Sequence, residues 1–538
     1  MKGILILRVA FLLFTFSMIS NFVSVPQVNL YNISPKLVSH SLESVGSLNN
    51  SVKTSSLLIK WSDVWAYYFK EHRAILGIPP DAEVIDVSIM NATFPDPNFH
   101  LYFSETFFRC YKVVCLEFQG GFNSRDDTFV NITYIPNRCS FYPVKYDELA
   151  DTIAPKFLVN YEQAKWWKGF PVLSVNKTVS FMLPSDPKKY IIITKEEWVD
   201  SVMPLAKWKE NKGLATYIAS VEWINRTYMG ASLPSKIKEF LKDAYNNWHF
   251  DYVVLTGGTN AIPTYYQFET AVPQDWYFVY LDEDEPPEWS RSWDFPEAII
   301  GRLPAKTREE LQAIVSKLVS YESNPLTGVW LQTGLEFYSW GFEDDYKFFE
   351  QHIVGNLTYK RYIYGYNLTM YPYQNNSFIS AVNEGASFIF VDAHGTSEVM
   401  EGILNVSPNL IGLLENGPKL PVIFATSCSI AAFDLSPNLA SELVSKSQGG
   451  AVLFFGKTRI GAEVPIDYQR LHDFLELANF RVGLMAFYAR VIGNINPSNH
   501  ILGDPEMSIW TIEPKLVSVY VPLKVLTGEN IVVTITDL

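Results

Sequence analysis

The chain has 538 residues, of which 48% are hydrophobic, and its formal net charge is −14. This length is sufficient for two to four domains, each with its own hydrophobic core. The acidic balance excludes nucleic acid as an expected partner, because phosphate binding needs a basic surface.

Residues 1–24 have the composition of a secretory signal peptide. Lys2 and Arg8 give a positive start, and the uncharged apolar run of residues 9–19 is too short for a comfortable membrane span. We therefore expect a secreted, extracellular protein, or a cell-surface protein if the segment is retained as an anchor. Ten N-x-S/T sequons support export as acceptors for surface glycans. They are at Asn32, Asn49, Asn91, Asn131, Asn176, Asn225, Asn356, Asn367, Asn375 and Asn405.

Residues 25–185 are predicted to form a mainly β N-terminal region, because segments such as 111–118 and 128–135 alternate between apolar and polar side chains. A helix is expected near residues 62–75. Three roles are open for this region: a pro-segment, a carrier domain or a fixed part of the mature protein.

Three of the four cysteines lie in this region, and one stands alone far from it. In an oxidising compartment Cys139 could pair with Cys110 or Cys115, which leaves one cysteine over, and the sequence does not decide this pairing. A disulfide to the distant Cys428 is the alternative. The spacing of the cysteines matches no zinc-binding pattern.

Residues 186–328 are predicted to form a first α/β subdomain. Strands are expected at residues 189–194, 215–220 and 252–256, and helices at residues 195–211 and 235–248. Each helix has apolar residues at helical spacing on one face. This alternating order predicts a parallel sheet with right-handed crossovers.

An acidic stretch, residues 282–285, lies between two further predicted strands of this subdomain. Such stretches are most often solvated loops. Asp282 and Asp284 offer an alternative, a structural calcium site, because calcium prefers carboxylate ligands. One acidic residue here could also orient a histidine or line a pocket for a basic side chain. No cofactor is required by this interpretation.

Residues 329–513 are predicted to form a second α/β subdomain, in which two apolar runs each lead to a reactive side chain. Residues 388–391 precede His394 and Gly395, and residues 422–425 precede Cys428. Such runs suit strands buried on both faces of a parallel sheet, whose chemistry lies beyond the strands' carboxyl ends. The pair therefore predicts a thiol nucleophile with a proton-transfer partner. A buried structural cysteine and a structural histidine are the alternative.

Residues 514–538 alternate again and are predicted to be β strands of a small, Ig-like domain. Two or three strands cannot form a stable sandwich alone. We therefore expect them to lie against the main body, unless the natural protein is longer.

Several stretches together resemble the gingipain-type cysteine peptidases, a family with a caspase-like fold. The resemblance covers residues 190–511, and its motifs occur in the family's order. These motifs are Tyr252 to Gly258 with Ala261 to Pro263, Pro296 to Pro304, Tyr321 with Glu322, His394 with Gly395, Ser427 with Cys428, Phe433 with Asp434, and Leu502 to Pro505. The family implies two side-by-side α/β subdomains, of which the second carries a catalytic dyad.

Carried over residue by residue, the resemblance implies that Cys428 is the nucleophile and His394 the general acid–base. The backbone N–H groups of Gly395 and Cys428 would form the oxyanion hole. Asp294 and Glu297 are candidates for an acidic partner of His394, because the family places an acidic residue just before the corresponding strand.

We therefore predict a secreted cysteine endopeptidase that cleaves protein or peptide substrates. The chain departs from the family pattern at Ala393 and at residues 429–432, which changes the floor of the site. Two alternatives belong to other classes. One is an inactive, peptidase-like adhesion or structural protein with an inert or disulfide-bonded Cys428. The other is a transpeptidase, in which an amine instead of water intercepts the thioester.

Overall fold

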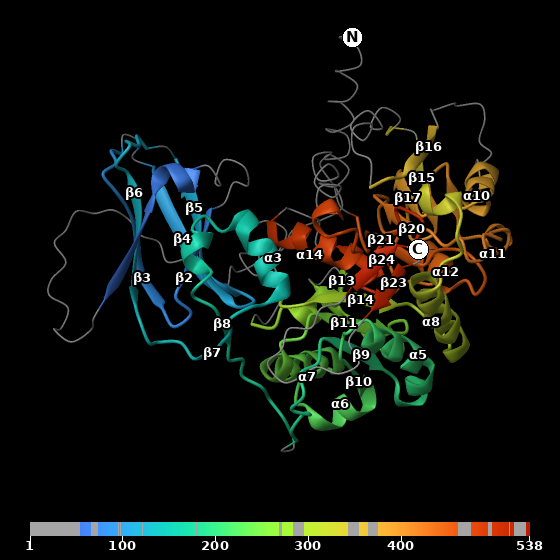
Figure 1. Cartoon of the computed structure of the whole chain (residues 1–538), viewed down its shortest axis with the longest axis horizontal. Coiled ribbons are helices and arrows are strands. Elements are labelled where there is room, and N and C mark those ends of the chain that lie inside the picture. Colours follow the sequence, from blue (N-terminus) through green and yellow to red (C-terminus); the bar gives the residue numbers. More distant parts are fainter. Residues whose placement is uncertain are drawn as a thin grey trace, which may run out of the picture.

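The computed structural model describes residues 54–65, 74–94, 96, 98–120, 122–178, 181–267, 272–282, 295–339, 341–342, 355–363, 375–460, 475–492, 498–515, 517–520 and 534–537. The predicted signal peptide, Asp284 and Asp294 lie outside these residues. Figure 1 shows the β-rich N-terminal region at one end of the molecule and the α/β body beside it. Within the described ranges, no helix has both the length and the apolar character needed to cross a membrane.

The N-terminal region contains two three-stranded antiparallel sheets, with strand orders β1-β6-β3 and β2-β5-β4. The strands are β1 (Ser55–Lys60), β2 (Ala74–Ile78), β3 (Glu83–Met90), β4 (His100–Phe108), β5 (Tyr111–Gln119) and β6 (Phe129–Ile135). Apolar side chains from both sheets form a shared core. The predicted end of the helix near residues 62–75 is wrong. Ala74 and Ile75 are the first residues of β2, a strand that is buried along its whole length.

None of the four cysteines forms a disulfide bond, so neither the pairing of Cys139 with Cys110 or Cys115 nor a disulfide to Cys428 is present. Cys110 and Cys115 are enclosed in the main core of the molecule. Cys139 is half-buried, and its Sγ accepts a hydrogen bond from Nζ of Lys112 at 3.1 Å. Burial raises the pKa of the Cys110 thiol well above its ordinary value, so this thiol is kept protonated.

The α/β body is built on one ten-stranded sheet with the order β10-β9-β11-β14-β22-β21-β20-β17-β15-β16. Its strands are β9 (Tyr190–Thr194), β10 (Thr216–Ser220), β11 (Tyr252–Thr256), β14 (Ile299–Leu303), β15 (Thr333–Tyr338), β16 (Thr358–Ile363), β17 (Phe388–Asp392), β20 (Val422–Ala425), β21 (Leu453–Lys457) and β22 (Asn499–Leu502). Neighbouring strands are parallel except for β21 and β22, where the two halves of the sheet meet antiparallel. The predicted α/β fold is confirmed.

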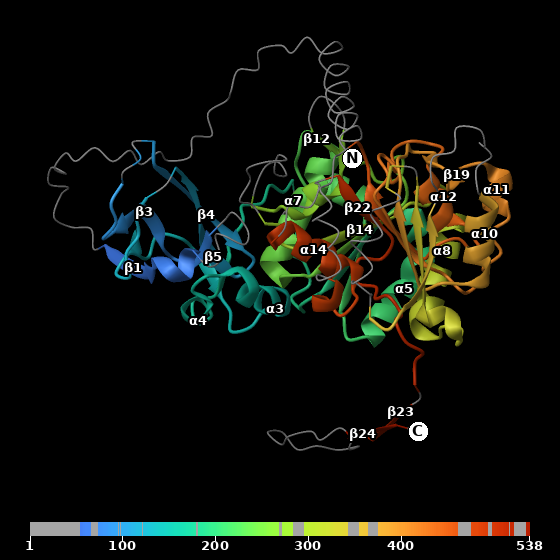
Figure 2. The ribbon, with the colours of Figure 1, turned by 90° about the horizontal axis from the view of Figure 1, so that it is seen from above.

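Helices cover this sheet and connect its strands. They are α5 (Val199–Asn211), α6 (Val221–Thr227), α7 (Leu233–Trp248), α8 (Arg308–Ser323), α10 (Asn375–Glu384), α11 (Pro408–Gly412), α12 (Leu439–Ser445) and α14 (Val482–Ile492). Helix α8 begins after Thr307, whose hydroxyl accepts a hydrogen bond from the N–H of Glu310. It contacts α5 from the first half and α12 from the second, so one helix layer spans both halves. Figure 2 shows these halves side by side.

One strand expected before the acidic stretch is a 3-10 helix, η2 (Asp275–Val279), whose five residues are all buried. A short apolar run of this kind fits a buried strand and a buried helix equally well from sequence. The last strand of the body is β22.

The N-terminal region is joined to the body by a continuous core. The Phe108 ring contacts the rings of Phe295 and Phe487, with centroids 5.6 and 6.1 Å apart. Arg109 is fully buried and binds Asp147 of its own region and Asp251 of the body, at 2.7 and 2.8 Å.

At the other end of the chain, β23 (Val517–Tyr520) and β24 (Thr534–Asp537) form an antiparallel pair, which Figure 2 shows apart from the α/β body.

Candidate active site

The predicted dyad follows two neighbouring strands. Strands β17 and β20 are parallel, and their last paired residues are Val391 and Ala425. His394 and Cys428 both come three positions after this last pair, so the two side chains lie at the same edge of the sheet. His394 is exposed and Cys428 is half-buried. Both are therefore open to a ligand, unlike a cysteine and a histidine enclosed in a core.

The loops that carry the dyad are in contact through Gly395. A Cβ atom added to Gly395 would lie 2.7 Å from the Cβ of Ser427 and 2.5 Å from the carbonyl oxygen of Val399. These distances leave no room for any side chain. The residue after His394 must therefore be glycine if the two loops are to approach this closely.

The loop after Cys428 is held by the segment that follows β21. Ser429 has the left-handed φ of 55°, and its N–H donates to the carbonyl of Arg459 at 3.3 Å. The guanidinium of Arg459 also binds both carboxylate oxygens of Asp434, at 3.0 and 2.6 Å. Arg459 thus contacts this loop next to Cys428 and again near its end.

Phe433 in the same loop rests on two buried side chains, Arg302 and His500. The Arg302 guanidinium lies 4.8 Å from the centre of the Phe433 ring, and the His500 ring lies 5.7 Å from it. Asp275 accepts two hydrogen bonds from Arg302, at 2.7 and 2.8 Å. Burial alone would raise the pKa of Asp275, but the charge and hydrogen bonds of Arg302 lower it below its ordinary value.

The structure does not bring Glu297 to His394. Strand β14 begins just after Glu297, and four strand spacings, about 19 Å, separate β14 from β17. The carboxylate of Glu297 accepts a hydrogen bond from the N–H of Leu281 at 2.6 Å, and burial raises its pKa well above the ordinary value. Asp294, the other candidate, is not among the described residues. The His394 ring instead meets the ring of Phe342, with centroids 4.8 Å apart.

Of the two predicted calcium ligands, only Asp282 is described. Its Oδ2 accepts a hydrogen bond from the hydroxyl of Thr106 in the N-terminal region, at 3.3 Å. Asp282 therefore takes part in the contact between the N-terminal region and the body. The calcium site stays a prediction.

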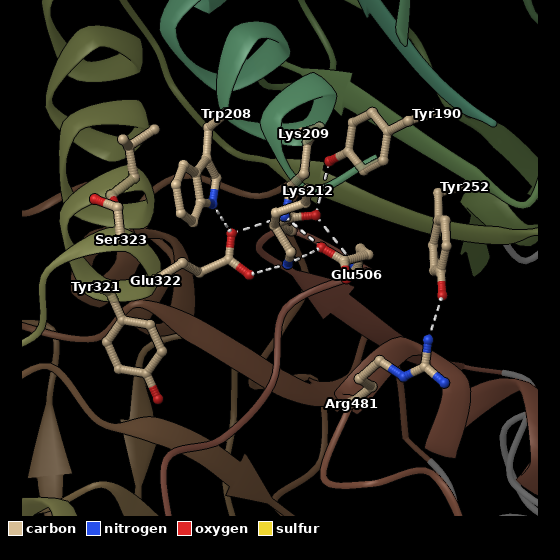
Figure 3. Close-up of polar contacts among 12 residues, drawn as sticks. Tyr190, Trp208, Lys209, Lys212, Tyr252, Tyr321, Glu322, Ser323, Arg481 and Glu506 are labelled. Atoms are coloured by element: carbon tan, nitrogen blue, oxygen red, sulfur yellow. Dashed lines mark hydrogen bonds and ion pairs between the residues drawn. The ribbon is translucent and has the colours of Figure 1, made fainter. Parts of the chain in front are cut away.

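A different set of carboxylates comes together at the junction of the two halves. Oxygen atoms of Glu322, Asp504 and Glu506 lie within 4.8 Å of one another, close enough in principle to hold a metal ion. The ammonium of Lys209 already lies among them, at 2.8, 2.5 and 2.7 Å, and Lys212 adds a second positive charge (Figure 3). Burial opposes the charged lysine, but the three carboxylates outweigh it and raise the pKa of Lys209. The cluster is thus an internal ion-pair network.

A cavity of about 810 Å³ adjoins both dyad loops. Glu398 and Val399, shortly after His394, form part of its wall, and Pro437 of the Cys428 loop forms another part. Glu310 and Glu442 contribute further carboxylates from α8 and α12. The loops that carry the dyad therefore also border a space large enough for a peptide side chain.

Comparison with known families matches this architecture. The sequence profile of peptidase family C25 aligns with residues 183–510, more than half of the chain. The chain belongs to peptidase family C25. This family includes the gingipains, so the resemblance seen in the sequence is confirmed and the chain is of the cysteine peptidase type.

Individual relatives are distant. An uncharacterized protein of Archaeoglobus fulgidus is 22% identical over 342 residues, which cover 54% of this chain and 80% of that protein. Lys-gingipain W83 of Porphyromonas gingivalis is 24% identical over 299 residues, which cover 51% of this chain and 16% of the gingipain. Gingipain R2 of the same species is 23% identical over 274 residues, which cover 48% of this chain and 34% of that gingipain. The match therefore spans only a minor part of the gingipains' own length.

Solved structures show the same fold. The crystal structure of the Arg-specific cysteine proteinase gingipain R has a TM-score of 0.51 at 19% identity, and the match covers 64% of this chain and 84% of that one. A further protease structure has a TM-score of 0.53 at 20% identity, and the match covers 64% of this chain and 83% of that one. At this level of identity, the likeness establishes the caspase-like α/β fold and leaves substrate preference open.

Proposed function

We propose that this chain is an exported cysteine endopeptidase, with Cys428 as nucleophile and His394 as general acid–base. The observation that carries the proposal is the position of these two accessible side chains beyond the carboxyl ends of neighbouring strands, in a member of a cysteine peptidase family. Proteins or peptides outside the cell are the proposed substrates.

The proposed reaction proceeds in two steps. The thiolate of Cys428 attacks the scissile carbonyl carbon, and His394 protonates the leaving amine as the C–N bond breaks. His394 then takes a proton from water, which hydrolyses the thioester and restores the thiol. The backbone N–H groups of Gly395 and Cys428 would hold the oxyanion, and one such donor is typically worth about 3 kcal/mol.

Export is supported by the predicted signal peptide and by the surface position of several sequons. Asn91, Asn225 and Asn356 are exposed and can therefore carry glycans. The ten sequons and the signal-like start favour a secreted or cell-surface location over one inside the cell.

We also propose that the N-terminal region stays bound to the body in the working protein. Its core is continuous with that of the body, and removal would leave Asp251 with Lys189 as its remaining cationic partner in place of the buried Arg109 guanidinium. Loss of a partner from a buried ion pair is costly. This favours a fixed part of the protein over a pro-segment that is discarded.

The decisive experiment compares the wild type with Cys428→Ala on a mixed peptide library, with products identified by mass spectrometry. Cys139→Ala is the matched control, because Cys139 is also half-buried but lies in the N-terminal region. Cleavage by the wild type and the control, but not by Cys428→Ala, supports the proposal. No cleavage, together with a Cys428 that does not react with iodoacetamide, would show an inactive scaffold. Ligated product after addition of an amine nucleophile would show a transpeptidase.

A further inference from the structure

A buried side-chain hydrogen bond joins the two strands that carry the dyad. Asp392 ends β17 and lies two positions before His394, and Thr426 directly follows β20 and lies two positions before Cys428. The hydroxyl of Thr426 donates to Oδ1 of Asp392 at 2.7 Å. The same hydroxyl oxygen accepts a hydrogen bond from the N–H of Ala393 at 3.4 Å.

This bond lies where the regular pairing of the sheet ends. The last backbone hydrogen bond between the two strands runs from the N–H of Thr426 to the carbonyl of Val391, at 3.0 Å. On its other side, the carbonyl of Asp392 accepts from the N–H of Ser339 at 3.0 Å, which ties Asp392 to the residue after β15. Asp392 therefore has a fixed backbone, and its side chain fixes Thr426.

Both side chains are shielded from water, since Asp392 is 3% exposed and Thr426 is 8% exposed. A hydrogen bond from a hydroxyl to a carboxylate is short and strong in such surroundings. The two loops leave the sheet immediately beyond it. A change in this pair would therefore be passed to His394 and Cys428 over only two residues of chain.

We propose that Thr426 and Asp392 are positioning residues that set the separation of His394 and Cys428. The inference rests on the proposed function, because it assigns a role within the same dyad. In this proposal both residues act through the loops they anchor. A displacement of about 1 Å in a catalytic group can lower the rate by roughly 100-fold, so a small relaxation here would be measurable.

The test uses Thr426→Val, which keeps the shape of the side chain but removes the hydroxyl, and Thr426→Ser, which keeps the hydroxyl. Asp392→Asn is the second probe if Thr426→Val does not fold. Alkylation of Cys428 by iodoacetamide is followed as a function of pH, with modification at Cys428 read by mass spectrometry. Peptide cleavage and thermal unfolding are measured on the same samples.

The inference predicts that Thr426→Val has a pH profile of alkylation close to that of His394→Ala, and that kcat falls by roughly 100-fold with KM little changed. Thr426→Ser retains the wild-type profile. A Thr426→Val protein with a lowered melting temperature but wild-type alkylation and kcat would overturn the inference, because the pair would then only stabilise the fold. If His394→Ala itself alkylates like the wild type, the dyad and hence the proposed function fail, which is a distinct result.

Discussion

The guanidinium of Arg302 lies 4.8 Å from the centre of the Phe433 ring, so a residue of the first half of the sheet supports the loop after Cys428 in the second half. Arg302 is held in place by Asp275 and by the carbonyls of Gly257 and Ile262, at 2.8 and 2.9 Å. The arginine that follows Gly301 in the family motif therefore has a structural role in the site. It forms the base on which the residues after Cys428 rest.

Replacement of Arg302 by methionine should destabilise the protein and impair the site. Asp275 is buried, and loss of its partner is expected to cost about 3–5 kcal/mol in the free energy of unfolding. Denaturant unfolding gives this value, and the rate of peptide cleavage by the folded fraction reports on the loop. Arg308→Met is the control, because Arg308 is a half-exposed residue at the start of α8. Unchanged unfolding of Arg302→Met would contradict the role assigned to this ion pair.

The close contact at Gly395 leads to a second prediction. Gly395→Ala would force a methyl group against the backbone of Val399 and the side chain of Ser427, and so separate the dyad loops. We expect the cleavage rate to fall by roughly 100-fold, with a smaller effect on the melting temperature. Gly258→Ala is the matched control, because a Cβ there would meet its nearest neighbour at an ordinary 3.9 Å. Equal activity of the two variants would show that the loops can separate without loss.

The Lys209 cluster gives a third prediction. Lys209→Met removes the ammonium shared by Glu322, Asp504 and Glu506 and leaves Lys212, which pairs with Glu322 and Glu506. The expected loss in the free energy of unfolding is about 3–5 kcal/mol, since buried carboxylates lose their partner. Lys207→Met on the exposed face of the same helix should change it by less than about 0.5 kcal/mol. If Lys209→Met and Lys207→Met have the same free energy of unfolding, the cluster contributes little to the stability of the contact between the two halves.

Much of the body could be predicted from sequence because its strands are short apolar runs buried on both faces. The runs before His394 and Cys428 are β17 and β20, and the helix expected at residues 235–248 lies within α7. The spacing of apolar residues and the order of the predicted elements can be read directly from the sequence, and they were sufficient to predict these strands and this helix.

The interactions that support the site could not be predicted, because each joins residues far apart in the chain. The Lys209 ammonium binds the carboxylate of Glu506, which lies 297 residues away in the sequence. The His500 ring accepts a hydrogen bond from the N–H of Asp275, which lies 225 residues away. Glu322 and Asp504 belong to motifs that resemble the family. Nothing in the sequence near either residue indicates that a lysine side chain lies between them. Cysteine count and compartment allowed a disulfide at Cys139, but neither indicates whether the fold brings two sulfur atoms within bonding distance, and none of the four cysteines forms one.

Acid should weaken the support that His500 gives to the loop after Cys428. Its Nε2 accepts from the N–H of Asp275 at 3.0 Å, and Nδ1 lies 2.8 Å from the carbonyl of Ser498. The ring must therefore be neutral, with its proton on Nδ1, and burial lowers the pKa of His500 to about 4. In the unfolded chain the pKa is about 6.5, so the unfolded state binds more protons between these two values. Stability is then fully present above about pH 6.5 and falls by about 3 kcal/mol as the pH drops to about 4.

Urea unfolding at a series of pH values checks this expectation. The wild type should lose stability steadily across this window, and His500→Asn should lose less, because its side chain does not titrate there. His249 adds a similar contribution, since burial lowers its pKa to about 4 beside the Phe170 ring, so the double variant with His249→Asn should lose still less stability than His500→Asn. If the slope of His500→Asn equals that of the wild type, protonation of His500 does not control the acid response of the site.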